Sequence, residues 1–454
     1  MLTSLRADAG GDAVAGLAES LFSHIDFSNG ALVAISGGSD STALLLLLKA
    51  YLDRNAPQTP LLAVTVDHGL RAGSAAEART VASLCATLGI VHRTMVWSDP
   101  KPASGIPAAA REVRYRLLAT AARQAGTGLI VTAHSADDQA ETVLMRQARS
   151  EEPATAYGRG LAGMAPATLY DWRTWIVRPL LRVGRETLRS FLRGRRIGWI
   201  NDPTNSDQHY ERPRIRADLH RGRGPHRIAD LLALAETAAA ARSDRSCRAA
   251  ALIRDCATRP VPGLIRLDPA FPQSERDAAV TALRLLLATA GGTAFPPDEA
   301  RTAALLDKIA TPPLCATLSR TVVDARRAGI FLHRERRDLP APLGAVDGMV
   351  WDGRYRIALH EDAGSVIVEP AGDVAPESPT MGESTAPASL IAAARAAEPA
   401  FRPSTTATAS PVVAPFDRFL PSFDLDLAGV LAGLVGARAL PRLPFNTRKT
   451  PTNA

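Results

Sequence analysis

The first 220 residues predict an α/β fold centred on a parallel, doubly wound, Rossmann-like sheet. Short apolar runs alternate with longer helical segments, which is typical of a parallel sheet covered by helices on both faces. Polar clusters follow several of these runs directly, where the carboxyl ends of parallel strands bind ligands. After this first domain at 1–220 we expect a helical domain at 221–312 and a smaller α+β region at 313–454.

The strands and helices of this sheet alternate along the chain. Most of the strands are nearly continuous apolar runs, as in LLAVTVD at 61–67, which predicts burial on both faces. Pro107 falls near the start of the third helix, where its missing N–H is not needed. The predicted strands are 30–36, 61–67, 91–97 and 128–134, and the predicted helices are 40–53, 74–89, 106–126 and 136–148.

The rest of the chain has a different composition. A long Ala-rich stretch after about 225 predicts a helix, and two more helical segments follow at 274–290 and 297–309. Segments 315–335 and 349–370 predict strands around turns. Residues 371–411 are rich in Ala, Pro, Ser, Thr and Gly, so we predict a linker or a poorly ordered segment there.

Composition limits where the protein acts. Hydrophobic residues make up 46% of the chain, yet no apolar run approaches the roughly 18 residues that a membrane-spanning helix needs. The N-terminal stretch lacks a basic start followed by an apolar block, so we predict no signal peptide and no membrane partner. The expected location is the cytoplasm. The oligomeric state is left open, a homodimer included.

The four cysteines argue against a metal cluster. Cys85, Cys247, Cys256 and Cys315 form no C-x-x-C pair. In a large chain with no signal peptide we expect reduced, partly buried thiols. A structural zinc site or a cysteine-held cluster is therefore not expected.

Positive charge is concentrated in one segment. The chain carries a net charge of +7, and residues 171–227 hold fourteen Arg, no Lys and six acidic residues, which leaves +8. Such a local block of arginines predicts contact with a polyanion. The alternative is a solvated, Arg-rich helix face.

The stretch SGGSDS, residues 36–41, separates the first strand from the first helix of the sheet. It is not a Walker A loop, because the Gly-Lys-Ser/Thr ending is missing. Its glycines still permit a tight turn that brings N–H groups near an anion, and the following helix begins there. Asp40 suits an anion site only if it binds an accompanying cation, most simply Mg²⁺. The predicted ATP-binding residues of this loop are Ser36, Gly37, Gly38, Ser39, Asp40 and Ser41.

The loop resembles the pyrophosphate loop (PP-loop) of the N-type ATP pyrophosphatases, and other motifs narrow the resemblance to the tRNA(Ile)-lysidine synthetase family. Their order and spacing match that family over roughly residues 28–220, and the likeness is weaker beyond 225. The motifs are VDHGLR at 66–71, AREVRY at 110–115, TAHSADDQAET at 132–142, RPLL at 178–181 and NDPTNSDQHYERPRIR at 201–216.

The resemblance implies a reaction and its partners. In this family ATP adenylates the C2 oxygen of the wobble cytidine in an isoleucine tRNA with a CAU anticodon, releasing pyrophosphate. The ε-amino group of free L-lysine then attacks C2 and expels AMP, leaving lysidine. The tRNA then reads AUA and is charged with isoleucine instead of methionine. ATP and Mg²⁺ are the implied cofactors.

Acidic residues after the fourth strand are candidates for the catalytic step, together with His134. Asp137 and Glu141 are four residues apart on one helix face, and Asp138 lies between them. Such carboxylates could bind a metal, hold the lysine ammonium group or take its proton, since the attacking amine must be neutral. The alternative is an acidic helix N-terminus favoured by the helix dipole.

The candidate site is completed by several arginines and by Asp67 and His68. Arg111 is predicted to stabilise developing negative charge, and Asp67 with His68 to contact the nucleotide at the end of the second strand. The alternative for Arg111 and Arg114 is that they are ordinary surface arginines, and the alternative for His68 is a structural role. The residues assigned to tRNA or phosphate contacts are Arg114, Arg178, Arg212, Arg214 and Arg216, and residues 221–312 are expected to bind tRNA.

Two positions depart from the family pattern. Ser135 stands where members usually carry a second histidine. The family's short Arg-Gly-Ser-Gly turn is replaced by SEEPATAYGRG at 150–160, which makes the role of residues 149–160 uncertain.

Three other functions were weighed. A cytidine thiolase of the same superfamily usually needs a C-x-x-C pair for an iron–sulfur cluster, and an ammonia-dependent ligase has no use for the basic segment. An inactive RNA-binding protein would keep the arginines but should have lost the loop, whereas SGGSDS and DDQAET are intact.

Overall fold

The computed structural model describes residues 11–149, 160–201, 211–219, 224–360, 364–373, 386–404 and 407–446. The chain divides into two compact units, residues 1–241 with 442–454 and residues 242–441. This division differs from the three predicted domains, because the long helix α8 (Gly224–Cys256) runs through the boundary and the predicted boundary at 312 falls inside the second unit.

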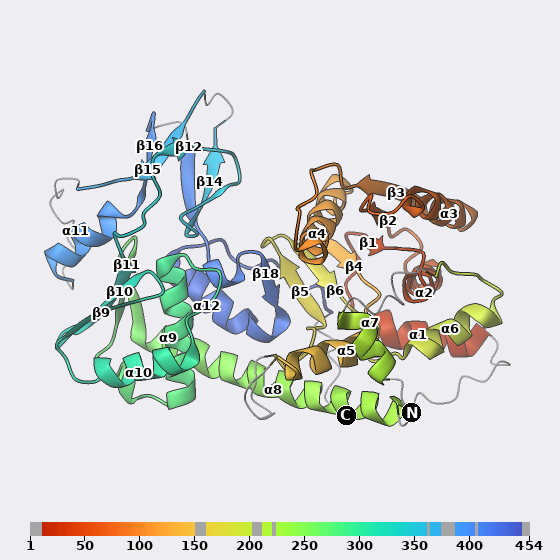
Figure 1. Cartoon of the computed structure of the whole chain (residues 1–454), viewed down its shortest axis with the longest axis horizontal. Helices are drawn as coiled ribbons and strands as arrows, with labels where there is room; N and C mark the ends of the chain where they lie inside the picture. Colours follow the sequence, from red (N-terminus) through yellow and green to blue (C-terminus); the bar gives the residue numbers. More distant parts are fainter. Residues whose placement is uncertain are drawn as a thin grey trace. The chain divides into compact units, whose positions relative to one another are not determined.

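The first unit holds a mostly parallel sheet, as predicted (Figure 1). Its strands lie in the order β5-β6-β4-β1-β2-β3, with β1 paired in parallel to both β2 and β4. The chain order reverses between β1 and β4, which is the switch point where open α/β sheets bind ligands. The bounds are β1 (Ala31–Ala34), β2 (Leu61–Asp67), β3 (Val91–Val96), β4 (Leu129–Val131), β5 (Ala167–Tyr170) and β6 (Thr174–Val177).

Helices cover this sheet and bury its apolar strands. All four residues of β1 are buried, as their unbroken apolar run predicts. Helix α4 packs on β1, β2 and β4, and α2 packs on α1 and α6. The bounds are α1 (Gly11–Phe22), α2 (Ser39–Asn55), α3 (Ser74–Thr87), α4 (Ile106–Gln124), α5 (Ala136–Gln147), α6 (Arg185–Gly194) and α7 (Glu211–Leu219).

The hairpin of β5 and β6 was not predicted from the sequence. The two strands are antiparallel and four residues long each. Asp171 and Trp172 both have positive φ, and the N–H of Arg173 donates to the carbonyl of Tyr170, which is a type I′ turn. Neither turn residue is the usual Asn or Gly, so the turn carried no clear sequence signal.

The second unit combines helices with antiparallel sheets. One sheet has the order β7-β8-β11-β10-β9 and packs against α9, and two small sheets have the orders β12-β15-β16 and β13-β14-β17. The helix bounds are α9 (Arg276–Gly291), α10 (Glu299–Ile309), α11 (Ala388–Ala396) and α12 (Leu425–Val435). The strand bounds are β7 (Ala257–Val261), β8 (Leu264–Leu267), β9 (Leu314–Leu318), β10 (Thr321–Arg326), β11 (Gly329–Arg334), β12 (Leu343–Gly344), β13 (Val350–Trp351), β14 (Tyr355–Leu359), β15 (Ile367–Pro370), β16 (Pro399–Arg402), β17 (Ala407–Pro411) and β18 (Phe419–Pro421).

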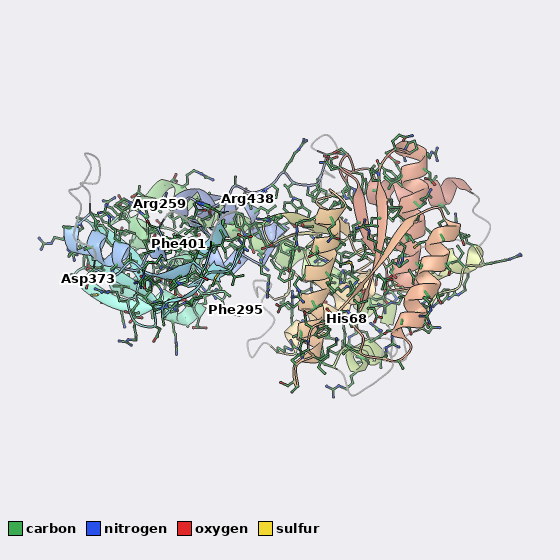
Figure 2. All side chains as sticks on the ribbon, turned by 90° about the horizontal axis from the view of Figure 1, so that it is seen from above. His68, Arg259, Phe295, Asp373, Phe401 and Arg438 are labelled. Atoms are coloured by element: carbon green, nitrogen blue, oxygen red, sulfur yellow. The ribbon has the colours of Figure 1, made fainter. Side chains whose placement is uncertain are left out.

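An ion-pair cluster in this unit surrounds Asp352. Its carboxylate accepts hydrogen bonds from Arg320, Arg334 and Arg354, and both Asp352 and Arg334 have fully buried side chains. These partners lie in the predicted strand regions, so the cluster is part of the packing between strands. Phe295, in contrast, is 85% exposed (Figure 2).

The prediction of a linker at 371–411 is wrong for the part of this segment that the structure describes. Helix α11 and strands β16 and β17 lie within it, whereas residues 374–385 fall outside the described ranges. Alanine makes a segment look simple in composition but is the best helix former. Strand β17 is held by its pairing with β14, a distant partner that composition does not reveal.

No helix among the described residues combines the length and the apolar character needed to cross a membrane.

Candidate active site

The loop between β1 and α2 is folded around its own hydroxyl groups. Gly37 has φ of 83°, and Gly38 precedes the first residue of α2. The Ser41 hydroxyl lies 3.2 Å from both the backbone N and the Oγ of Ser36, and it donates to the carbonyl of Gly38 at 3.1 Å. The N-terminus of α2 and these hydroxyls therefore face one point, which suits an anion.

Gly37 can be replaced only at a cost to this loop. A Cβ there would lie 2.5 Å from Cδ1 of Ile200, and the positive φ is unfavourable for any other residue. We expect Gly37→Ala to destabilise the protein by about 1–2 kcal/mol and to weaken ATP binding. Urea unfolding and ATP titration measure both effects. Gly194→Ala is the control, because nothing lies within 4 Å of its Cβ; equal behaviour of the two variants would contradict the assignment.

Helix α5 begins with a capping box formed by Ser135 and Asp138. The Asp138 carboxylate accepts from both the backbone N–H and the hydroxyl of Ser135, each at 3.0 Å. The same hydroxyl lies 3.3 Å from Asp40 Oδ2. Ser135 therefore links α5 to the loop helix at the position where a second histidine was expected.

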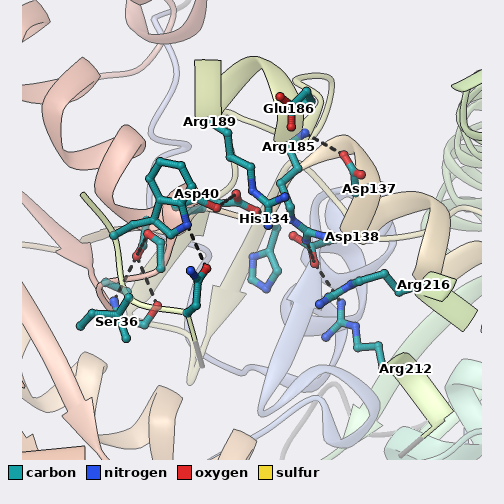
Figure 3. Close-up of a pocket in the computed structure, with 18 of the residues that line it drawn as sticks. Ser36, Asp40, His134, Asp137, Asp138, Arg185, Glu186, Arg189, Arg212 and Arg216 are labelled. Carbon is teal, nitrogen blue, oxygen red and sulfur yellow. Dashed lines mark hydrogen bonds and ion pairs between the residues drawn. The ribbon is translucent and has the colours of Figure 1, made fainter. Parts of the chain in front are cut away.

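Arg185 contacts the four carboxylates predicted for the loop helix and α5, and Figure 3 shows three of them, Asp40, Asp137 and Asp138. Its Nε donates to Asp40 at 3.0 Å, its Nη2 donates to Asp138 at 3.1 Å, and its Nη1 lies 3.7 Å from Glu141. Its backbone N–H donates to Asp137 at 2.8 Å. Nearby carboxylates raise the pKa of Arg185 although burial opposes them, so the guanidinium stays charged.

Glu141 is buried beneath three guanidinium groups. Its side chain is 1% exposed, and it accepts from Arg212 at 3.0 Å and from Arg216 at 2.6 Å, besides its contact with Arg185. These arginines are four residues apart on α7, so they share a helix face. The carboxylate anchors α7 to α5.

Two adjoining cavities open at the carboxyl edge of the sheet. The first, of about 650 Å³, is lined by polar residues of the loop, α5 and α6, whereas the second, of about 670 Å³, has apolar walls from β1, β2 and α4. The residues that line both are Ala34, Ser36, Gly38, Arg114, Ile200, Arg212 and Arg216. The first is lined by Ser39, Asp40, Ser41, His134, Asp137, Asp138, Arg185, Arg189, Trp199, Arg212 and Arg216, among others.

Comparison with known proteins agrees with this geometry. A family model described as a PP-loop domain matches residues 16–222. The tRNA(Ile)-lysidine synthase of Mesorhizobium japonicum is 55% identical over 442 residues, 94% of this chain and 97% of that protein. The tRNA(Ile)-lysidine synthase of Brucella melitensis biotype 2 is 41% identical over 336 residues, 71% of this chain and 73% of its own.

The chain belongs to the tRNA(Ile)-lysidine synthase family.

Among solved structures, a U34-tRNA thiolase from Methanococcus maripaludis is similar at 15% identity, with a TM-score of 0.39 over 50% of this chain and 79% of that one. A likeness at this level does not bear on function.

The residues predicted for tRNA contact lie in different surroundings. Arg214 is exposed, as expected, while Arg212 and Arg216 line the first cavity and pair with Glu141. Arg178 is buried and donates to the Ala165 carbonyl at 2.7 Å. In that position the side chain supports the β5–β6 hairpin. Because its guanidinium group is buried, Arg178 cannot make the predicted contact with tRNA. The sequence could not show this, because RPLL gave no measure of burial.

The predicted nucleotide residues Asp67 and His68 line the second cavity. Asp67 accepts from the N–H of Gly69 at 2.8 Å, and His68 packs edge-on to Trp97. Burial, aided by the charge of Arg114, lowers the pKa of His68, so its imidazole is neutral at pH 7.

The two arginines of α4 that were predicted to clamp phosphate differ in their position relative to the cavities. Arg114 lines both cavities, whereas Arg111 is exposed, with its guanidinium 5.0 Å from the ring centre of Tyr115. Arg114 is thus the better placed of the two to reach a phosphate.

Sequence reasoning missed Arg185, Arg189 and Trp199. Arg185 is the first residue of α6, where a cation opposes the helix dipole. That unfavourable position was the available signal, since it requires anions nearby. Within the described part of the chain, the buried Nε of Arg189 has no hydrogen-bond partner. The altered segment at 150–159 lies outside the described residues.

His134 is neutral in this site. Burial lowers the pKa of its imidazole well below the usual 6.5, and nearby arginines including Arg178 lower it further, while Asp138 opposes them. Its Nδ1 lies 3.0 Å from the Thr132 hydroxyl.

The unfolded state should therefore bind more protons than the folded state as the pH falls through 6.5, so the free energy of unfolding should fall with it. His134→Gln should remove part of that slope. Chemical denaturation from pH 5 to 8 measures it, and NMR titration of the imidazole checks the cause. Protonation of His134 near pH 6.5 in the folded protein would contradict this.

Proposed function

We propose that the chain ligates free L-lysine to C2 of the wobble cytidine in tRNA(Ile) with a CAU anticodon, using ATP and releasing AMP and pyrophosphate. One observation carries the proposal beyond family membership: the phosphate-binding loop and the acidic start of α5 line the same cavity. An activation step and a following attack can therefore occur without moving the substrate between sites.

In the first step, the C2 oxygen attacks the α-phosphorus of ATP and pyrophosphate leaves. The loop hydroxyls and the N-terminus of α2 would hold the departing phosphates. Arg189 supports this assignment, because its Nε is buried without a partner at the wall of the same cavity. The second cavity beside the loop combines apolar walls from β1, β2 and α4 with polar groups such as Asp67 and His68, which suits the adenine and ribose.

Asp40 fits a magnesium ion that arrives with ATP. Mg²⁺ in nucleotide sites uses one or two carboxylates together with phosphate oxygens and water. Asp40 lies in the first turn of α2 and lines the first cavity. The described residues contain no group of three or more His, Cys, Asp or Glu side chains arranged to hold a metal, so phosphates and water would complete its coordination.

In the second step, the lysine amine attacks C2, the C2–O bond breaks and AMP leaves with the oxygen. The amine must first lose a proton. We assign Asp137 to hold the ammonium group and to accept that proton, because it lines the cavity, whereas Glu141 is committed to α7. Exposed Arg214 and the basic segment around it would contact the tRNA backbone.

A thiolase function is less well supported. Cys85 lies in the first unit and the other three cysteines lie in the second, and burial raises the pKa of the Cys85 thiol to about 11. A thiolate cluster would need low-pKa thiols gathered in one place.

The test is ATP-dependent incorporation of labelled lysine into a CAU-anticodon isoleucine tRNA, with methionine tRNA as the control. We expect label in the isoleucine tRNA only. AMP release without label would mean that the activation is right and the nucleophile or the RNA is wrong. All of these components occur in the cytoplasm, which we propose as the location.

A further inference from the structure

The side chain of Arg185 contacts both parts of the proposed site, the phosphate-binding loop with α2 and the acidic start of α5. Asp40 belongs to the loop helix α2, whereas Asp138 and Glu141 belong to α5, and Arg185 reaches all three from α6. Each of its three guanidinium nitrogens is directed at a different carboxylate. The side chain is only 13% exposed, so it is held in this arrangement and screened from solvent.

The charges around Arg185 are closely balanced. Asp40, Asp137, Asp138 and Glu141 carry four negative charges, and the guanidinium groups of Arg185, Arg212 and Arg216 supply three positive ones. Arg212 and Arg216 lie on the Glu141 side, and Arg212 also approaches Asp138 at 3.6 Å. Within the described part of the chain, the ion-pair partner of Asp40 is Arg185. If another cation replaces Arg185 beside Asp40, the guanidinium can move, and its neutralisation of the α5 carboxylates must then change.

We propose that Arg185 is a positioning residue that couples ATP binding to lysine binding. This inference rests on the proposed function and deepens it. With ATP bound, Asp40 would hold the accompanying magnesium ion, so the guanidinium of Arg185 would lose its Nε partner and turn toward the phosphates. Asp138 would then lose part of its counter-charge, while Asp137 would keep its hydrogen bond from the Arg185 backbone, and the acidic start of α5 would bind the lysine ammonium group more tightly.

The direction of the coupling follows from the charges. Before ATP arrives, Arg185 competes with the ammonium group for the same carboxylates, so lysine binds weakly. With ATP bound, the competing cation is drawn to the polyphosphate. ATP and lysine should therefore bind with positive cooperativity, and by linkage each should raise the affinity for the other by the same factor.

The experiment measures lysine affinity by calorimetry for the full chain, with and without a non-hydrolysable ATP analogue and Mg²⁺. In the unsubstituted protein we expect the analogue to tighten lysine binding at least about fivefold. In Arg185→Lys and Arg185→Gln the factor should fall to about twofold or less, because neither side chain can bridge three carboxylates. Two variants are used so that one remains if the glutamine variant does not fold.

Arg182→Gln is the matched control. Arg182 lies three residues before Arg185, is 75% exposed and pairs with Glu236 at the surface, so the coupling factor should be unchanged. A purely structural role for Arg185 predicts that both affinities fall together with their ratio kept, and that result would overturn the inference. So would equal lysine affinity with and without the analogue in the unsubstituted protein.

The two proposals fail in distinguishable ways. Lysine binding that is measurable but uncoupled would remove the inference and leave the proposed reaction intact. Absence of lysine binding in every protein, together with no incorporation into tRNA, would overturn the proposed function itself.

Discussion

Replacing Asp40 with asparagine should reduce ATP-dependent pyrophosphate release by about 10³-fold. The substitution keeps the size of the side chain but removes the charge that Arg185 and the proposed magnesium ion require. Asp40 also accepts from Ser39 at 2.9 Å on one carboxylate oxygen and from Ser135 at 3.3 Å on the other. The amide keeps one of these contacts through its oxygen, and its NH₂ group can donate to the other serine hydroxyl. The fold should therefore survive, and tRNA affinity, measured by filter binding, should stay within a few fold.

Asp53→Asn is the control for this variant. Asp53 lies on the same helix, is 56% exposed and pairs with Lys49 at the surface. Its removal should leave pyrophosphate release unchanged. Turnover of Asp40→Asn at the unsubstituted rate would remove Asp40 from the mechanism.

Glu141→Gln should produce the largest loss of stability. The side chain is 1% exposed and neutralises Arg212 and Arg216, so the amide would remove the anion that pairs with Arg216 and the nearer of the two that pair with Arg212. Removing one partner of a buried ion pair costs about 3–5 kcal/mol. Urea unfolding should show a loss near the lower value, because both arginines are partly exposed.

This prediction also concerns α7. If Glu141 anchors that helix, trypsin should cleave after Arg214 and Arg216 faster in the variant than in the unsubstituted protein. Glu236→Gln, which alters an exposed pair with Arg182, should change neither stability nor cleavage. A stability loss without faster cleavage would mean that α7 has other anchors.

Local patterns predicted the parallel sheet well. The predicted runs gave β1, β2 and β3 within about two residues at either end, and α2 to α5 likewise. The unbroken apolar run of β1 reflects burial on both faces, whereas the predicted burial of β3 is wrong, because that strand lies at the edge of the sheet and is largely exposed. The loop and its candidate carboxylates were found for a related reason: glycines, hydroxyls and acids directly after a buried strand have few structural explanations.

Long-range contacts could not be predicted in the same way. Arg185 is one of fourteen arginines in its segment, and its place at the start of a helix separates it from the exposed Arg182 only once the bounds of α6 are known. Arg178 is buried only because the β5–β6 hairpin folds over it. The strands β16 and β17 exist because β15 and β14 pair with them. In each case the deciding partner is distant in sequence or lies in an element that the sequence did not reveal.

The measurement that tests the central claim most directly is a reaction with α-labelled ATP and tRNA in the absence of lysine. If the cavity activates the cytidine, label should accumulate on the isoleucine tRNA as an adenylate, and added lysine should release it as AMP. Label on lysine rather than on tRNA, when both are present, would show that the amino acid is the activated partner. That result would contradict the assignment of the loop and the α5 carboxylates to a single reaction on the RNA.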